Sequence, residues 1–220
     1  MVYKIDAGQG ILYVTVQKSG PKQRGRPRAY DPDRALGEAR DAFWTRGYAA
    51  TSLDELSGAM AMNRPSLYAA FGDKHALYVK TLELYRSDAR AQLAEKLSGA
   101  RPLAEELRGV YRFALASYLA TPSPRGCFLI GTAVTEATGD PAVRDVLAAA
   151  LAEIEEGFAR RFRLARERGE LAAGADPDAL ARLAAAVLYS LAIHARAGLP
   201  RPALDAIAEA AVRSICAENR

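Results

Sequence analysis

Basic side chains gather near the start of the chain and could hold an anionic partner by charge. The basic positions between residues 18 and 28, with no acidic residue among them, are Lys18, Lys22, Arg24, Arg26 and Arg28. Glycine and proline separate them, which predicts a flexible arm attracted to polyanions. A basic run also occurs as a solvated tail that only promotes solubility. The residues that follow must decide between these two interpretations.

Cys127 is the second candidate for chemistry, because it follows Arg125 and Gly126 at the expected start of a helix. An arginine and a helix N-terminus both favour the thiolate, which is the reactive form of cysteine. A free cysteine is also common as a small apolar core residue. The sequence therefore leaves two interpretations of Cys127 open, a redox sensor and a core residue.

The other residue types argue against several kinds of site. Cys216 lies 89 positions after Cys127, which argues against a disulfide scaffold or a zinc site. His75 and His194 have no metal-ligand partner at helical spacing. A catalytic nucleophile and its general base could come only from Cys127 and His194, and nothing in the sequence brings these two residues together. We therefore predict no catalytic residue, no metal and no cofactor.

The elements that position these residues are expected to be helices. Half of the 220 residues are apolar, enough to bury one good core or a small domain beside a larger one. Alanine, leucine, arginine and glutamate dominate, so we predict an all-α fold of about nine helices. Residues 1–20 resemble nothing that follows. They could form a β-ribbon arm, or come from a mis-assigned translation start, with the true start near Val14 or Val16.

We expect a cytoplasmic protein that does not enter a membrane. No uninterrupted apolar stretch reaches the roughly 18 residues needed to span a bilayer. Residues 11–16, ILYVTV, are too short, and Lys4 and Asp6 precede them without a small-residue cleavage site, which is a poor signal peptide. The two separated cysteines suit a reducing compartment.

Three short helices follow the basic run, each bounded by residues that begin or end helices. They cover about residues 32–47, 51–62 and 63–72. Thr51 and Asp54 have the spacing of a capping box, and Asn63 can cap the third helix. An ordinary three-helix bundle has the same helix lengths. The basic run directly upstream favours a helix-turn-helix, because DNA carries about one charge per 1.7 Å and rewards cations beside a groove-reading element.

A family resemblance becomes specific at residues 43–77, FWTRGYAATSLDELSGAMAMNRPSLYAAFGDKHAL. Residues 26–86 resemble the DNA-binding domain of TetR/AcrR-type transcriptional regulators. One departure is that the family's turn usually has glycine where Ala61 stands and a small residue where Met60 stands. An alanine can serve there if that position is not left-handed. The resemblance implies three parts: a basic arm (1–28), a helix-turn-helix domain (29–74) and an effector-binding and dimerisation domain (75–220).

The resemblance makes residues 64–70 the recognition helix. Arg64 is then the best candidate for a guanine contact, with a phosphate contact almost equally expected. Ser66 adds a polar group, and Pro65 can touch thymine methyl groups. The residues that resemble phosphate clamps, each at or near a helix end, are Thr51, Tyr68 and Lys74. The residues of the arm that could reach the minor groove are Arg24, Arg26 and Arg28.

In the second half, the resemblance covers only the layout of the helices. It implies a small-molecule pocket enclosed by the fourth to the eighth helices, for which the candidate lining residues are Tyr111, Tyr118, Phe128, Thr132 and Glu136. It also implies that the last two helices pair with those of a second copy. The apolar residues at helical spacing that suit this interface are Leu183, Val187, Leu191, Ile207, Ala211 and Ile215. Either set could instead pack only inside one subunit.

The function that these observations favour is a dimeric transcriptional regulator, most often a repressor in this family. Its partners would be a palindromic double-stranded operator, a second copy of the chain and an unidentified small-molecule effector. Modification of Cys127 is the alternative trigger for release from DNA. An architectural DNA-binding protein without sequence preference and an enzyme are the weaker alternatives.

Overall fold

The computed structural model describes residues 2–6, 11–15, 31–172 and 174–216, which fall into two compact units, Met1–Asp31 and Pro32–Arg220. In the first unit, strands β1 (Val2–Asp6) and β2 (Ile11–Thr15) pair antiparallel, with Val2 opposite Thr15. The β-ribbon is thus the conformation of these two segments, an addition to the predicted all-α fold, while a mis-assigned start stays a prediction. The predicted DNA-contacting residues Arg24, Arg26 and Arg28 lie outside the described residues.

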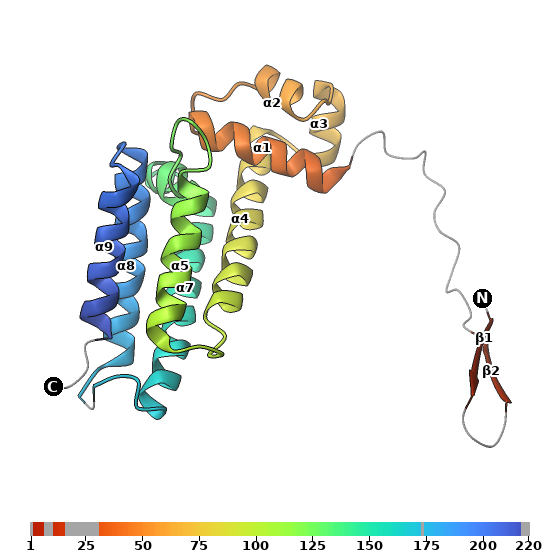
Figure 1. Ribbon diagram of the computed structural model, residues 1–220. Helices are drawn as coiled ribbons and strands as arrows, with labels where there is room; N and C mark the ends of the chain where they lie inside the picture. Colours follow the sequence, from red (N-terminus) through yellow and green to blue (C-terminus); the bar gives the residue numbers. More distant parts are fainter. Residues whose placement is uncertain (1, 7–10, 16–30, 173, 217–220) are drawn as a thin grey trace. The chain divides into compact units, whose positions relative to one another are not determined.

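Three short helices open the second unit, as predicted: α1 (Pro32–Arg46), α2 (Leu53–Ala59) and α3 (Arg64–Phe71). They lie together at one end of this unit (Figure 1). Their shared core is made of side chains at helical spacing, all of them buried: Phe43, Leu56, Leu67 and Phe71. Because α2 and α3 are joined by a four-residue connection, they form the helix-turn-helix that the sequence indicated.

The capping box of α2 lies one residue further along the chain than predicted. Ser52 is the N-cap, and its hydroxyl accepts a hydrogen bond from the Glu55 N–H. The Glu55 carboxylate accepts one in return from the Ser52 N–H, at 2.8 Å. The predicted pair, Thr51 and Asp54, does not form it, because the Thr51 hydroxyl is buried and donates to the Gly47 carbonyl at 2.6 Å.

The turn between α2 and α3 contains a residue in the left-handed region. Ala61 has a φ of 50°, a conformation in which a Cβ atom is crowded against the backbone. The condition under which alanine could replace the family's glycine without cost is therefore not met. Met60 and Met62 are buried on either side of Ala61, and the Met62 N–H donates to the Ser57 carbonyl at 3.0 Å. These contacts hold the turn in place despite the strain.

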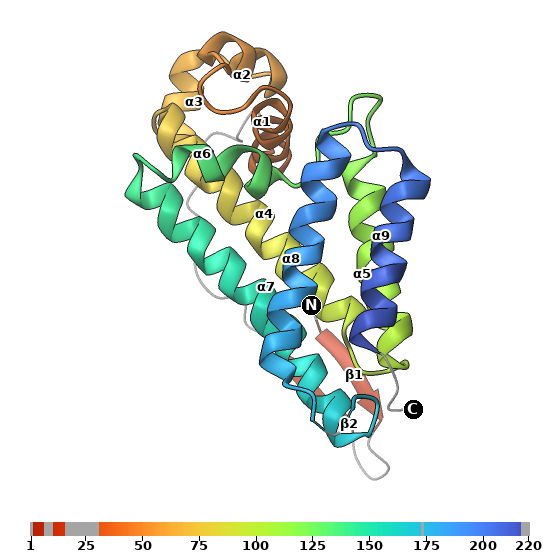
Figure 2. The ribbon, with the colours of Figure 1, turned by 90° about the vertical axis from the view of Figure 1, so that its left-hand side faces the viewer.

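The remaining long helices form a bundle: α4 (Lys74–Lys96), α5 (Leu103–Tyr118), α7 (Pro141–Glu167), α8 (Pro177–Arg196) and α9 (Arg201–Ile215). Helix α7 packs against α4 and α8, and α9 packs against α5 and α8 (Figures 1 and 2). Helix α4 also packs against α1, so it continues from the helix-turn-helix into the bundle. With the short helix α6 (Val134–Glu136), the described residues contain nine α-helices, as predicted.

The predicted sixth helix, residues 127–138, is not one continuous α-helix. A π-helical segment, η1 (Leu129–Ala133), precedes the three-residue α6. Its Leu129 and Ala133 are buried, and η1 touches α1, α4, α7 and α8. A π-helical turn is often found at functional sites, and here it lies where the helix-turn-helix domain meets the bundle.

By length and composition, α8 is the one helix in the described part of the chain that could cross a membrane. Counting uninterrupted apolar residues missed it, because Asp178 and Arg182 break the run. Seven of its alanine and leucine residues are buried: Ala181, Ala184, Ala185, Leu188, Leu191, Ala192 and Ala195. Since α8 packs against α5, α7 and α9, its apolar character is that of a core helix.

The predicted dimer residues of α8 and α9 divide between the interior and the surface. Leu191 and Ile215 are buried inside the subunit, so these two predictions are corrected: they support the face rather than form it. Leu183 is exposed, and three further residues are half-buried, namely Val187, Ile207 and Ala211. The exposed Ile193 extends this apolar face along α8.

A buried ion cluster ties α5 to α7 at the end of the bundle away from α1. The Arg161 guanidinium donates to the Glu106 carboxylate, to Glu170 at 3.0 Å and to the Arg101 carbonyl at 3.0 Å. Glu170 also accepts a hydrogen bond from the Leu103 N–H at 2.5 Å. The cluster therefore fixes the start of α5 against the last turns of α7.

Candidate DNA interface and effector cavity

The N-terminal turn of α3 presents the predicted base-reading residues to solvent. The Asn63 side chain accepts a hydrogen bond from the Ser66 N–H at 2.8 Å and so starts the helix. Arg64 and Pro65 are exposed, Ser66 is half-buried, and Tyr68 is exposed one turn further along. These four side chains thus lie on or beside one free end of a short helix, as a groove-reading element requires.

Asp54 holds the Arg64 side chain in place, a contact that the sequence did not indicate. The Arg64 Nε and Nη2 atoms lie 3.0 and 2.7 Å from the same Asp54 carboxylate oxygen. The two residues are ten positions apart and on different helices, so no helical spacing could reveal the pair. Both side chains are largely exposed, so the guanidinium can exchange this carboxylate for another acceptor.

Thr51 does not present a hydroxyl to DNA, which corrects its prediction as a phosphate clamp. Its side chain is fully buried and bonded to the Gly47 carbonyl. That bond closes the connection between α1 and α2. Thr51 therefore shapes the loop that precedes α2 and does not offer its side chain to a phosphate.

Lys74 begins α4 and lies beside the loop that precedes α2. Its ammonium group is 4.5 Å from the centre of the Tyr48 ring and 3.4 Å from the Ala49 carbonyl. The N-cap of the same helix is Asp73, whose carboxylate accepts from the Ala76 N–H. Tyr48 thus positions the charge of Lys74 at a helix N-terminus, where the phosphate contact was predicted.

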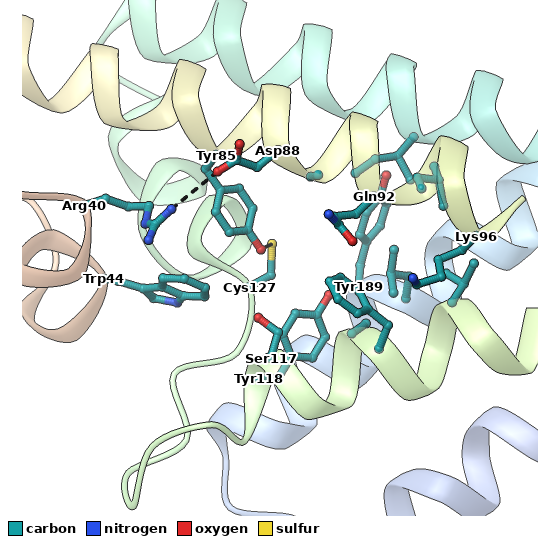
Figure 3. A pocket seen from close by; sticks show the side chains of 17 residues that line it. Arg40, Trp44, Tyr85, Asp88, Gln92, Lys96, Ser117, Tyr118, Cys127 and Tyr189 are labelled. Carbon is teal, nitrogen blue, oxygen red and sulfur yellow. Dashed lines mark hydrogen bonds and ion pairs between the residues drawn. The ribbon is translucent and has the colours of Figure 1, made fainter. Parts of the chain in front are cut away.

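A cavity of about 260 Å³ lies between α1, α4, α5, α7 and α8. Most of its wall is apolar, from residues such as Leu93, Val110, Ile154 and Leu188. Its polar side chains come mainly from α4, α5 and α8 (Figure 3). Two more lining residues, Arg40 and Trp44, belong to α1 of the helix-turn-helix domain. A molecule in this cavity would touch both parts of the protein at once.

Of the five residues predicted to line the pocket, the structure places Tyr118 in this cavity and the other four elsewhere. Tyr111 is buried between α5 and α8 and donates to the Ala184 carbonyl at 3.2 Å. Phe128 and Thr132 are core residues, and the Thr132 hydroxyl accepts from Tyr78 at 2.8 Å. Glu136 is the last residue of α6 and does not line the cavity.

The residues of α4 that line the cavity were missed: Tyr85, Asp88, Ala89, Gln92, Leu93 and Lys96. They recur at helical spacing on one face of α4, so a search for polar residues on that face could have found them. The polar lining side chains of this face follow one another along the cavity (Figure 3). No sequence pattern indicated that Trp44 and Tyr189 would line a cavity.

Cys127 lines the same cavity, but its surroundings differ from those predicted. Arg125 does not activate it: the guanidinium stacks 4.5 Å from the Trp44 ring and lies 3.6 Å from Asp41. Burial raises the pKa of the Cys127 thiol, despite hydrogen bonds from backbone N–H groups and from Tyr85, whose hydroxyl lies 3.5 Å from the sulfur. The thiol form is therefore favoured over the thiolate.

Comparison with known proteins decides the family. Residues 35–81 match the family described as bacterial regulatory proteins, tetR family, and residues 104–211 match the tetracyclin repressor-like C-terminal domain. The transcriptional repressor ComR of Escherichia coli K12 is 31% identical over 194 residues, which cover 87% of this chain and 92% of ComR. The chain belongs to the TetR family. It is a DNA-binding transcriptional regulator and not an enzyme.

Solved structures of TetR-family proteins share this fold. A cysteine mutant of the regulator CifR, complexed with 26-base-pair operator DNA, is 39% identical to this chain, with a TM-score of 0.76. The match covers 86% of this chain and 99% of CifR. The reduced form of Escherichia coli NemR has the same TM-score at 20% identity, over 86% of this chain and 97% of NemR, and shows the fold alone.

In this TetR-family chain, aromatic side chains connect the cavity with the DNA-facing end. Each ring centre lies between 4.8 and 6.2 Å from the next along the series Trp44, Tyr85, Phe128, Tyr78 and Tyr48. The ammonium group of Lys74 lies over the last ring, that of Tyr48. The series runs from α1 to α4, then to the residue before η1, back to α4 at Tyr78, and finally to Tyr48 in the loop after α1. A displacement at the cavity therefore has a packed route to Lys74.

Proposed function

We propose that the protein is a dimeric repressor that leaves a palindromic operator when a small molecule occupies the cavity. The observation that carries this proposal is the sharing of one cavity between α1 and the bundle. A ligand that fits the cavity better in one arrangement of α1 and α4 shifts the protein toward that arrangement, by no more than its differential affinity for the two. Helix α4, which runs from Lys74 beside α3 into the cavity wall, would carry the change.

Arg64 would read a guanine or bind a phosphate, with Pro65 and Ser66 beside it. Tyr68 and Lys74 would bind phosphates on either side of the recognition helix. The residues of the basic arm, Arg24, Arg26 and Arg28, would add minor-groove contacts. Such a protein acts in the cytoplasm, where the operator and a diffusing effector are both within reach.

A second copy of the chain would cover the apolar face of α8 and α9. Leu183 and Ile193 are exposed there, next to half-buried Val187, Ile207 and Ala211. A two-fold dimer would place two recognition helices about one helical turn of DNA apart and so match a palindrome. Leu183→Glu should give monomers in light scattering. Val134→Glu, an exposed apolar position on α6, is the matched control and should stay dimeric.

Genome-wide mapping of bound DNA tests the regulator proposal, and the expected result is a few strong sites, one near the protein's own gene. Even occupancy of the genome would instead indicate an architectural protein. With an operator in hand, Ala114→Trp tests the coupling without a known effector, because Ala114 lines the cavity. Filling the cavity should lower operator affinity at least about fivefold. Ala116→Trp, on the exposed side of the same helix, should leave it unchanged.

Modification of Cys127 is the second candidate trigger, favoured by the position of its sulfur in the cavity wall beside Tyr85. Because its pKa is raised, reaction with a thiol reagent should be slow near neutral pH and speed up as the pH rises. Operator release by hypochlorite or methylglyoxal that is lost in Cys127→Ser would support this trigger. Release that persists in Cys127→Ser would eliminate it.

A further inference from the structure

Arg64 and Lys74, the cations of α3 and α4 that are proposed to contact DNA, differ in how their charges are compensated. The described contacts of Lys74 are with neutral groups, the Tyr48 ring and the Ala49 carbonyl. Arg64 instead forms an ion pair with Asp54, whose Oδ1 atom lies 3.0 Å from Nε and 2.7 Å from Nη2. Lys74 therefore offers DNA a full positive charge, whereas Arg64 and Asp54 together carry no net charge.

The ion pair occupies only one edge of the Arg64 guanidinium. A guanidinium has five N–H donors in a rigid fork. Asp54 accepts from Nε and from one hydrogen of Nη2, and no other acceptor among the described residues contacts the group. The end of the fork, with one hydrogen of Nη1 and the second hydrogen of Nη2, stays unpaired on a side chain that is 52% exposed. Two parallel N–H donors match the O6 and N7 atoms of guanine in the major groove.

Charge compensation separates a base contact from a phosphate contact. A phosphate attracts a cation through its charge, and much of the gain in binding comes from released counterions. A guanidinium already paired with a carboxylate loses most of that gain. The edge of a guanine base is neutral and is recognised through directed hydrogen bonds, which the carboxylate leaves in place. Asp54 thus makes Arg64 a poor phosphate ligand and keeps its base-reading edge intact.

The first turn of α2 holds Asp54 where it can do this. A helix N-terminus favours a negative charge, and Asp54 is the second residue of α2. The neighbouring carboxylate of Glu55 is already bonded to Ser52 and lies 2.6 Å from Arg46, so it does not compete for Arg64. The exposed pair is weak in water. It strengthens when DNA displaces that water, because the effective dielectric constant falls.

We propose that Asp54 determines the sequence specificity of the DNA interface, by orienting Arg64 onto a guanine and cancelling its attraction for phosphate. The inference rests on the proposed function in taking α3 as the helix that enters the major groove. A carboxylate close to the phosphates also lowers the affinity for DNA of any sequence. Asp54 therefore weakens binding in general and increases the difference in affinity between the operator and other DNA.

Asp54→Asn tests the proposal, because it keeps the size of the side chain and restores the full charge of Arg64. Fluorescence anisotropy at several salt concentrations measures binding of the full chain to a random duplex and to the operator duplex recovered by genome-wide mapping. Affinity for random DNA should rise, with a salt dependence steeper by about one phosphate, while the ratio of operator to random affinity falls at least about fivefold. Glu38→Gln, which removes an exposed carboxylate from α1, is the matched control and should leave the ratio unchanged.

Two further measurements assign the effect to the ion pair. In the Arg64→Ala background, Asp54→Asn should leave the ratio unchanged. Replacing the operator guanines one at a time with 7-deazaguanine removes the N7 acceptor and keeps the base pair. At one position this should weaken binding of the unchanged protein about fivefold, and binding of Asp54→Asn much less. Hypoxanthine there, which lacks only the minor-groove amino group, is the control and should have little effect.

The proposal is overturned if Asp54→Asn raises the affinity for both DNAs by the same factor, if Arg64→Ala flattens the salt dependence on random DNA by a full phosphate, or if no operator guanine requires its N7 atom. The last measurement uses the unchanged protein and so decides even if a variant folds poorly. An operator preference that survives in Asp54→Asn overturns this inference alone. Equal binding of the unchanged protein to both DNAs refutes the sequence-specific regulator as well.

Discussion

Arg64 and Arg161 both hold carboxylates, but they differ completely in exposure. The side chains of Arg64 and Asp54 are 52% and 77% exposed, whereas those of Arg161 and Glu106 are 0% and 3% exposed. An exposed pair contributes about 0–1 kcal/mol, because water and salt compete with it. A buried pair is costly to break, because the partner left behind keeps its charge away from water. The same chemistry therefore orients the side chain proposed to read DNA in one place and fixes a helix in the other.

Removing one carboxylate from the buried cluster should have the largest effect. Glu106→Ala leaves the Arg161 guanidinium buried with only Glu170 as a charged partner, so the free energy of unfolding should fall by about 3–5 kcal/mol. Urea unfolding followed by circular dichroism measures the loss. Glu105→Ala, on the exposed side of the same helix turn, should change the value by no more than about 0.5 kcal/mol. Equal losses in the two variants would show that the cluster has no special role.

Removing the exposed arginine should leave stability almost unchanged and act on DNA binding instead. Arg64→Ala should weaken operator binding by about 1–3 kcal/mol and binding to random DNA much less, if the guanidinium contacts a guanine. Lys74→Ala should weaken both and reduce the salt slope by about one. Fluorescence anisotropy at several salt concentrations measures both quantities. Equal losses on the two DNAs for Arg64→Ala would assign it to a phosphate.

Local signals predicted the helices well because most boundaries here are set by local bonds. Asn63, Asp140 and Asp176 each cap the helix that follows them through their own side chains, and a proline occupies each of those first turns. The failures arose where tertiary contacts decide. Thr51 lost the capping role because its hydroxyl is buried against Gly47. Residues 127–138 were read as one helix, although packing between four other helices makes part of the segment π-helical.

The candidate site likewise has one part that local sequence determines and one part that tertiary contacts determine. The residues proposed for recognition, 64–66 and 68, lie within five positions of the sequence, so one short pattern selected all of them. The cavity draws on five helices, and the distance in sequence between Trp44 and Tyr189 hides their common wall. The aromatic residues chosen from the sequence, Tyr111 and Phe128, satisfy the same helical spacing as lining residues but face the core. Periodicity identifies a buried face and cannot tell a packed core from a cavity.

Acid should weaken the buried cluster through Glu170. Burial raises the pKa of this carboxyl, but the hydrogen bonds from Arg161 and from the Leu103 N–H outweigh burial, so the folded-state pKa lies below its usual value. The unfolded chain then binds the proton more readily, and the stabilisation is present above about pH 4.5 and lost as the pH falls through the folded-state value. Urea midpoints between pH 3 and pH 7 should fall less steeply for Glu170→Gln than for the unchanged protein. Parallel curves would contradict this assignment.

The smallest expected effect concerns the turn between α2 and α3, just before Arg64. Here the substitution relieves backbone strain and removes no contact. Ala61 has a φ of 50°, and a left-handed residue with a Cβ atom costs about 1–2 kcal/mol. Glycine removes that cost but adds about 0.4–1 kcal/mol of chain entropy to the unfolded state. Ala61→Gly should therefore stabilise the protein by roughly 0.5–1 kcal/mol in urea unfolding. Ala59→Gly, an exposed position at the end of α2, is the control and should destabilise it, because a helical alanine gains nothing from a left-handed conformation. If both variants destabilise equally, the turn holds no strain for glycine to relieve.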